Sequence, residues 1–372
     1  MKNFRTTVSR VCGPVVLAFA FAIAPAVHAE GDFYQQHNLV SDGFVPADHF
    51  DAKLVNGWGV AFNPFGPIWV ADNGSGVSTI YDGLGVAASL VVNIPSPNSS
   101  AGGGTPTGIV FNASAGFEVS KGNPARFIFA TEDGLIAAWS PTADMTHAIT
   151  VINNSAGAAV YKGIALSAGG TGSLLYAADF RNARIDIFDN SFKPVALPMG
   201  AFTDPNLPVG FAPFGIQAIN GNIYVSYAKQ DAARHDDVAG KGLGFVNVFD
   251  PNGKLIRRVV SGGRLNAPWG MTLAPAGFGK FSNRLLVGNF GDGRVNAYDL
   301  DTGKFVGRLK APGGKPIQID GLWGITFGNG FANAPVNTLF FAAGPGDELH
   351  GLYGRIDVAP GDAHDDGPED TD

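Results

Sequence analysis

A glycine followed by a short apolar strand recurs six times along this chain, and no other feature constrains its fold as strongly. Each copy has one residue before the glycine and an apolar residue after it, and the copies lie 49 to 55 residues apart. The six copies are Trp58-Gly59-Val60, Thr107-Gly108-Ile109, Lys162-Gly163-Ile164, Phe214-Gly215-Ile216, Trp269-Gly270-Met271 and Trp323-Gly324-Ile325. Near-equal spacing over this length indicates a repeat architecture, in which each unit buries its apolar face against its neighbours.

A second strand follows the glycine strand in every repeat, and a third follows in four of them. The second strands are expected at residues 68–72, 127–132, 175–179, 223–227, 285–289 and 339–343, and the third strands at 77–82, 185–189, 245–250 and 295–299. These segments alternate small or polar residues with β-branched and aromatic ones, which is the pattern of half-buried strands. A fourth strand is expected in repeats such as those at 254–260 and 305–309.

Four short strands in a repeat of this length are typical of a propeller blade, so the fold class is an all-β, six-bladed β-propeller. The sixth repeat ends with a strand near 352–358 and has no fourth strand of its own. An unassigned strand remains at 33–40, before the first repeat. If this strand pairs with the last blade, the ring closes and no sheet edge is left exposed. We therefore expect one domain over residues 30–359, closed by its N-terminal strand.

The first 29 residues have the pattern of a secretory signal peptide. Lys2, Arg5 and Arg10 precede an apolar run at 11–24, and Val27-His28-Ala29 is a small-x-Ala cleavage pattern. That run is shorter than the roughly 20 residues that a membrane anchor needs. The sequence therefore predicts cleavage after Ala29, a mature chain without a membrane span, and an exported protein, either periplasmic or extracellular.

The predicted mature chain contains no cysteine and is acidic. Cys12 is the one cysteine of the chain and lies within the predicted signal peptide, which excludes disulfides, zinc-thiolate sites and a thiol nucleophile from the mature chain. The net charge of the full chain is −7, and removal of three basic residues makes it more negative. This charge disfavours nucleic-acid binding. Residues 360–372 form an acidic tail that is expected to be disordered.

The repeats resemble NHL-type six-bladed propellers, in which Pro-x-Gly opens the inner strand, as at Pro106-Thr107-Gly108, Pro213-Phe214-Gly215 and Pro268-Trp269-Gly270. More narrowly, the segments YQQHNLVSD at 34–42 and LVNGWG at 54–59 resemble a family of exported bacterial proteins. The resemblance covers the whole mature chain and implies a propeller fold without an assigned biochemical function. Many members of that family carry a PEP-CTERM sorting tail, and no such motif follows residue 358 here.

The residue before each inner-strand glycine is expected near one mouth of the central channel. This position holds Trp58, Thr107, Lys162, Phe214, Trp269 and Trp323, so three of the five tryptophans of the chain share it. One interpretation is an aromatic plug whose rings pack on one another. The other is a ligand-binding mouth in which the aromatic rings stack a sugar or an apolar ligand and Lys162 holds an anionic group.

An enzyme is the alternative to a binding propeller. Gluconolactonase-type propellers, which this chain resembles in architecture, place Asn and Asp before the inner-strand glycine to hold a divalent cation, and this chain has no oxygen-rich residue there. A second polar ring is expected where the second strands end. It comprises Asp72, Glu132, Asp179 and Asn289. These side chains either converge on a rim, as a hydrolase or lyase would need, or cap backbone N–H groups.

Two further segments bear on metal binding. His235-Asp236-Asp237 lies in a polar insertion at 229–242, and we interpret it as a solvated loop. Asp299 and Asp301 resemble the start of a calcium loop but lie where each repeat has a turn. The sequence therefore predicts no metal, no cofactor and no catalytic residue. The leading interpretation is an exported non-catalytic binding or scaffold propeller, whose partner is a small molecule, a glycan or an envelope protein.

Overall fold

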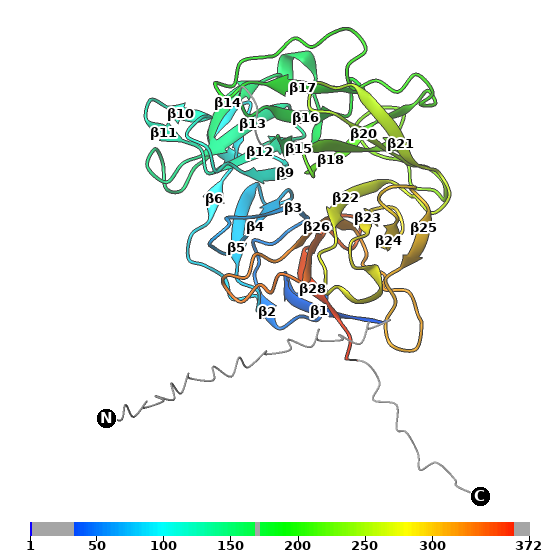
Figure 1. Cartoon of the computed structure of the whole chain (residues 1–372). Helices are drawn as coiled ribbons and strands as arrows, with labels where there is room; N and C mark the ends of the chain where they lie inside the picture. Colours follow the sequence, from blue (N-terminus) through cyan, green and yellow to red (C-terminus); the bar gives the residue numbers. More distant parts are fainter. Residues whose placement is uncertain (2–32, 168–171, 361–372) are drawn as a thin grey trace, which may run out of the picture.

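Six blade sheets stand around a common axis in the computed structural model, as Figure 1 shows, and they are antiparallel except for one short parallel pair at the outer edge of the last blade. The structure describes Met1, residues 33–167 and residues 172–360. Apart from Met1 and Pro360, the predicted signal peptide and acidic tail lie outside these residues. The six-bladed β-propeller predicted from the repeats is confirmed. Among the described residues, no helix has the length and apolar character needed to cross a bilayer.

The first three blades follow one another along the chain, and each is numbered from its innermost strand outward. Blade 1 contains β3 (Gly57–Phe62), β4 (Ile68–Asp72), β5 (Val77–Tyr81) and β6 (Val92–Asn93). Blade 2 contains β9 (Pro106–Phe111), β12 (Phe127–Thr131), β13 (Leu135–Trp139) and β14 (Ile149–Asn153). Blade 3 contains β15 (Tyr161–Leu166), β16 (Leu175–Asp179) and β17 (Arg184–Phe188), and no fourth strand is found for it among the described residues.

The other three blades complete the ring. Blade 4 contains β18 (Phe211–Ile219), β19 (Asn222–Lys229), β20 (Phe245–Phe249) and β21 (Leu255–Ser261). Blade 5 contains β22 (Pro268–Leu273), β23 (Leu285–Asn289), β24 (Val295–Tyr298) and β25 (Phe305–Arg308). Blade 6 contains β26 (Leu322–Phe327), β27 (Leu339–Ala343), β28 (Leu352–Val358), β1 (Tyr34–Ser41) and β2 (His49–Phe50).

Short elements lie in the loops between and within the blades. Two ribbons, β7 (Pro95–Ser96) with β8 (Ser99–Gly103) and β10 (Glu118–Ser120) with β11 (Asn123–Pro124), lie outside the blade sheets, and the 3-10 turns are η1 (Ser155–Gly157) and η2 (Gly279–Phe281). The second and third strands begin and end within a few residues of where alternation predicted them. The pattern succeeds because a propeller strand packs between two neighbouring blades and therefore keeps a regular apolar periodicity.

The repeated glycine is required where adjacent inner strands approach each other. A Cβ atom on Gly59 would lie 2.5 Å from the carbonyl oxygen of Thr107 in blade 2, and one on Gly324 would lie 2.6 Å from that of Trp58 in blade 1. Real Cβ atoms do not approach a backbone oxygen this closely. The equivalent glycine of every blade lies equally close to the backbone of the next inner strand. The repeated glycine is therefore the residue that lets adjacent inner strands pack together as the channel wall.

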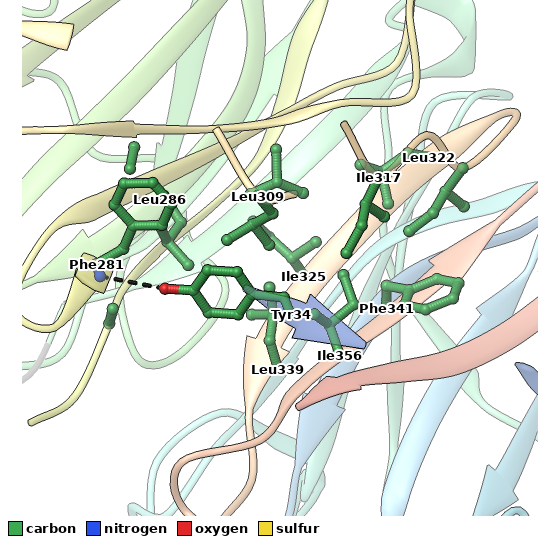
Figure 2. Close-up of a cluster of buried hydrophobic side chains, with 14 of the residues drawn as sticks. Tyr34, Phe281, Leu286, Leu309, Ile317, Leu322, Ile325, Leu339, Phe341 and Ile356 are labelled. Atoms are coloured by element: carbon green, nitrogen blue, oxygen red, sulfur yellow. Dashed lines mark hydrogen bonds between the residues drawn. The ribbon is translucent and has the colours of Figure 1, made fainter. Parts of the chain in front are cut away.

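The N-terminal strand closes the ring, as the sequence predicted. Strand β1 pairs antiparallel with β28 from Tyr34–Val358 to Ser41–Leu352, and the two strands lie side by side in Figure 1. The Tyr34 side chain lies in the core between blades 5 and 6, among residues that include Leu286 and Phe341 (Figure 2). Its hydroxyl donates to the Phe278 carbonyl at 3.0 Å and accepts from the Phe281 N–H at 3.2 Å. A buried ring with both hydrogen bonds made fastens the closing strand to the neighbouring blade.

Candidate functional site

The central channel has two ends that differ in chemistry. The residues before the six glycines gather at one end, and the residues one to three positions after them line the other. Between the two ends the glycine strands enclose a cavity of only 40 Å³, which Trp269 and Met271 also line. Such a space holds about one or two water molecules. The two ends are therefore separate candidate sites.

Aromatic rings fill the first end, and we call them the aromatic plug. Its members come from five blades: Trp58, Phe180, Phe214, Trp269, Phe290 and Trp323. Trp323 stacks on Trp58 with 3.7 Å between ring centroids and on Phe290 with 3.9 Å. The Trp323 indole N–H donates to Asn56 Oδ1 at 3.1 Å. Of the plug residues that precede a glycine, Trp58, Phe214 and Trp323 are at most 1 % exposed and Trp269 is 8 % exposed. The rings pack on one another, and of the plug members only Phe290 is partly exposed.

The two polar residues of the same ring are also buried. The Thr107 hydroxyl lies within hydrogen-bond distance of two carbonyl oxygens, 2.9 Å from that of Tyr161 and 3.2 Å from that of Ala130. The Lys162 ammonium pairs with Glu132 and, at 3.4 Å, with Asp236, and it lies 5.0 Å from the centroid of the Trp58 ring. Thus all six residues predicted at this mouth come together, and the cation among them is neutralised by the protein itself.

A group of charged side chains covers the plug around Lys162, and we call it the charged cap. It comprises Glu132, Lys162, His235, Asp236, Asp237 and Glu348. Burial alone would lower the pKa of Lys162, but the carboxylates of Glu132, Asp236 and Glu348 outweigh burial and hold that pKa above its usual value. Lys162 therefore stays charged at neutral pH and acts as the cation that holds the cap together.

Two carboxylates of the cap lack a cationic partner in contact. Burial raises the pKa of Asp237 to about 7, with the nearby Glu348 and Asp236 charges adding to the shift and Lys162 opposing it. Burial likewise raises the pKa of Glu348, whose carboxylate accepts a hydrogen bond from Asn56 Nδ2 at 2.8 Å. Burial opposes the ionised form of Asp236, but the charges and hydrogen bonds of Lys162 and His235 together outweigh burial, so the pKa of Asp236 is lowered. The cap therefore carries excess negative charge.

The sequence reasoning missed the role of the blade 4 insertion. The insertion is more than a solvated loop: it crosses the plugged end, although its Asp236 side chain is 64 % exposed. Its Gln230 side chain donates to the carbonyl of Phe180 in the preceding blade at 2.6 Å, and its Gly240 N–H donates to Asn266 near the following blade at 2.6 Å. Asp236 then reaches Lys162, which is 74 residues away along the chain. In the sequence, only the length of the insertion indicates that it could reach across this end, because the local charge of a loop does not determine where the loop lies.

Three side chains of the cap have a geometry that a metal ion can use. Glu132, His235 and Asp236 place one potential ligand atom each within 4.8 Å of one another. The Lys162 ammonium contacts two of these three residues. A lysine ammonium already supplies the positive charge at this position, so the arrangement is satisfied by the chain alone.

The predicted polar rim does not form one cluster. Asp179 accepts hydrogen bonds from the N–H groups of Val160 and Asn182, and Asp72 accepts one from the N–H of Thr79. Asn289 donates to the Arg264 carbonyl at 2.8 Å. Burial raises the pKa of both Asp72 and Asp179. Each of these three side chains therefore makes its hydrogen bonds within its own repeat.

Glu132 differs from the other three because it occupies a different register. Strand β12 ends at Thr131, and Thr131 pairs with Pro106 as Asn289 pairs with Pro268. Glu132 lies one residue further on, equivalent to Asn73 in blade 1 and Phe290 in blade 5, and these residues turn toward the axis. Asn73 Nδ2 donates to Glu132 Oε2 at 2.8 Å. The sequence alignment of the four rim residues was thus one residue off at blade 2.

The second end of the channel opens into a concave site of 450 Å³, which we call the funnel. It lies where the inner strands end. Its lining comprises Val60, Ala61, Phe62, Ile109, Val110, Phe111, Ala165, Leu166, Gln217, Ala218, Thr272, Ile325, Thr326, Phe327 and Asn329. None of these fifteen residues is ionisable. Its volume is typical of a small-molecule site. Most of the lining residues are apolar, but the surface that they and their backbone expose is more polar than apolar.

The rim of the funnel is held by an amide. Asn329 Nδ2 donates to the carbonyls of Asn63 at 2.7 Å and Gly66 at 2.9 Å, which ties the β26–β27 loop to the β3–β4 loop. Next to it, Phe65 and Phe331 pack edge to face with 5.4 Å between centroids, although Phe65 is 76 % exposed. The sequence reasoning did not single out this end, because its residues look like ordinary strand residues.

Comparisons with known proteins identify relatives and fold neighbours. No protein-family model matches the chain. The uncharacterized protein R648 of Acanthamoeba polyphaga mimivirus is 33 % identical over 334 residues, which is 86 % of this chain and 78 % of R648. The uncharacterized protein L690 of the same virus is 34 % identical over 331 residues, 86 % of this chain and 84 % of L690. Because these relatives are viral, the bacterial origin expected from the sequence resemblance is not supported.

Two solved structures share the fold. A Bacteroides thetaiotaomicron protein of unknown function aligns with a TM-score of 0.55 at 11 % identity, over 87 % of this chain and 76 % of that chain. A streptogramin B lyase aligns with a TM-score of 0.51 at 11 % identity, over 88 % of this chain and 98 % of that chain. At this level of identity the likeness concerns the propeller architecture alone.

Proposed function

The chain belongs to the family of the uncharacterized mimivirus proteins R648 and L690, and from this premise we propose that it is a non-catalytic propeller that binds a neutral small molecule in the funnel. The observation that carries the proposal is the lining of the funnel, where none of fifteen residues is ionisable. General acid–base catalysis needs a titratable group within hydrogen-bond reach of the substrate. A site without one is suited to binding.

The contrast with the plugged end supports the same assignment. Lys162, the residue expected to anchor an anionic ligand, is 1 % exposed and is already paired with Glu132. A ligand at that end would have to displace stacked aromatic rings and break a buried ion pair. The funnel needs no such rearrangement, and its volume lies within the range of about 300–1,000 Å³ typical of small-molecule sites.

The hydrolase or lyase alternative needs carboxylates that converge. Asp72 and Asp179 each accept hydrogen bonds from backbone N–H groups of their own repeat, and Glu132 is engaged by Lys162. The carboxylates that do gather, in the charged cap, stand over a closed plug. The alternative is therefore not favoured by the position of these groups.

Titration with N-phenyl-1-naphthylamine, a neutral fluorophore that brightens in apolar surroundings, tests the proposal. We expect saturable binding by the folded protein. Thr272→Lys, which places a charge in the half-buried funnel wall, should weaken binding at least roughly tenfold because an ammonium without a partner must be desolvated. The matched control is Thr150→Lys, on the exposed strand β14, which should bind as the parent does.

Two outcomes of this titration would contradict the proposal. If the parent protein shows no saturable binding, or if Thr272→Lys and Thr150→Lys bind the fluorophore equally, then the funnel is not the binding site.

We also propose that the protein is exported, either to a periplasm or to the medium. The support is the sequence of residues 1–29, with its basic start, its apolar run and its cleavage pattern at Val27-His28-Ala29. Expression of the full chain in a bacterium and mass spectrometry of the product should show an N-terminus at Glu30. An intact N-terminus in the cytoplasm would contradict export.

A further inference from the structure

We propose that the funnel recognises a ring-shaped neutral ligand with two different sides, one apolar and one carrying a hydroxyl or carbonyl group. This inference rests on the proposed function and adds the chemical class of the ligand. It comes from the position two residues after each inner-strand glycine, which lines the funnel in all six blades at equivalent points of the wall.

The residues at this position are divided into two halves around the axis. In blades 1, 2 and 3 they are apolar, and in blades 4, 5 and 6 they are polar: Ala61, Val110 and Ala165 against Gln217, Thr272 and Thr326. A scaffold that needed only strand packing has no reason to segregate them. Because neighbouring blades are neighbours in space, the funnel has one continuous polar arc facing one continuous apolar arc.

The polar arc is free to bind a ligand. Among the described residues, the side chains of Gln217, Thr272 and Thr326 make no hydrogen bond to another part of the protein. Asn329 provides the contrast, because its amide also lines the funnel but is used to tie two loops together. The hydroxyls of the two threonines and the Gln217 amide can each donate and accept. They therefore suit a group such as a hydroxyl or a carbonyl on one edge of the ligand.

The apolar arc is built to face a ring. The small side chains of Ala61 and Ala165 line the funnel while packing into the cores between blades, and Phe62 and Phe111 line it one residue further along their strands. Phe111 is supported from behind by Phe127, with 5.3 Å between ring centroids. A sugar, which carries hydroxyls around its whole edge, would leave some of them unpaired against this arc, and unpaired buried hydroxyls are costly. The arc thus favours a hydroxylated aromatic or alicyclic compound over a saccharide.

Displacement of N-phenyl-1-naphthylamine by two matched competitors tests the inference. 2-Naphthol and 2-methylnaphthalene are both neutral at pH 7 and differ by a hydroxyl in place of a methyl group. The ratio of their dissociation constants is measured for the parent and for the triple variant Gln217→Leu, Thr272→Val and Thr326→Val. We expect the preference for the hydroxyl compound to fall by roughly three- to tenfold in the triple variant, the effect of one hydrogen bond.

Controls separate the inference from the proposed function. The single variant Thr326→Val keeps the shape of a strand residue and covers the case in which the triple variant does not fold. Thr150→Val, on β14, should leave the ratio unchanged. If the fluorophore binds but the ratio is the same in the parent and in both funnel variants, the two-sided funnel is wrong and the proposed function stands. If the fluorophore does not bind, the proposed function fails, and the inference fails with it. Glucose should not displace the fluorophore, and displacement by glucose would overturn the choice of ligand class.

Discussion

One channel wall made of six equivalent strands ends in two unlike surfaces. At the plugged end, stacked rings and a buried lysine–carboxylate pair fill the channel. At the funnel end, the same strands leave a cavity of 450 Å³ with free polar groups on one side. The repeated glycine strands build the channel wall. The residues before each glycine determine the packing of the plugged end, and the residues after it determine the lining of the funnel.

The difference shows how a propeller divides its tasks. Aromatic residues before the glycine fill the axis, where they hold the blades together through packing. Aliphatic residues directly after it line the narrow channel, and smaller or polar residues beyond them open the funnel. The tryptophans before the glycines and Lys162 are thus buried in the plug, while the residues that we propose for binding are ordinary strand residues.

The largest expected effect is the loss of a plug ring. Trp323→Ala removes two stacked contacts and the hydrogen bond to Asn56, and it should lower the free energy of unfolding by about 3–5 kcal/mol. Urea unfolding gives this value. Binding of N-phenyl-1-naphthylamine by the folded variant should stay within twofold of the parent. Weak binding together with intact stability would reverse the roles assigned to the two ends.

The next effect concerns the ion pair. Lys162→Met keeps the length of the side chain but leaves Glu132 without its ammonium, which should destabilise the fold by about 2–4 kcal/mol. The double variant Lys162→Met with Glu132→Gln should recover most of this loss, because no charge then remains unpaired. Lys193→Met, at an exposed position, is the matched control and should change little. A double variant no more stable than the single one would show that the pair is not what holds the cap.

A smaller, pH-dependent effect is expected at Asp237. Its pKa is raised to about 7 by burial, with Glu348 and Asp236 adding to the shift and Lys162 opposing it. The ordinary value is about 3.9. A raised pKa means that the carboxyl stabilises the fold most below pH 4, and that this stability is lost as the pH rises to 7.

Asp237→Asn removes this dependence. The variant should match the parent at pH 4 and exceed its free energy of unfolding by about 2 kcal/mol at pH 8, a figure reduced from the full shift because the side chain is only partly buried. Urea unfolding at the two pH values measures the difference. A parent as stable as the variant at pH 8 would show that the carboxyl is ionised without cost.

Much of the fold followed from sequence because its main contacts are periodic. Gly59 and its five equivalents predict the positions of the inner strands. The unassigned segment beginning near Tyr34 predicts the closing strand, because a closed ring leaves no sheet edge unpaired. These features depend on backbone geometry that every blade shares, so repetition makes them visible.

The site was less predictable because it depends on what differs between blades. The spacing placed Trp58 and Trp323 at one mouth, but it did not tell that their rings are buried in one another. Asp236 reaches Lys162 only because an insertion crosses the axis, and no local pattern encodes that path. The residues of the two arcs, such as Ala61 in the apolar arc and Thr326 in the polar arc, can be read from the sequence. That they form two opposite sides of one funnel is visible only once the blades are arranged in a ring.

A crystal structure of the protein soaked with 2-bromonaphthalene tests the central claim most directly. Bromine scatters anomalously, so its position can be assigned without reference to the shape of the ligand. The account predicts one strong bromine peak in the funnel, with the ring against Phe62 and Phe111 and the plug unchanged. A peak among Trp58, Trp269 and Trp323 with an empty funnel would contradict it.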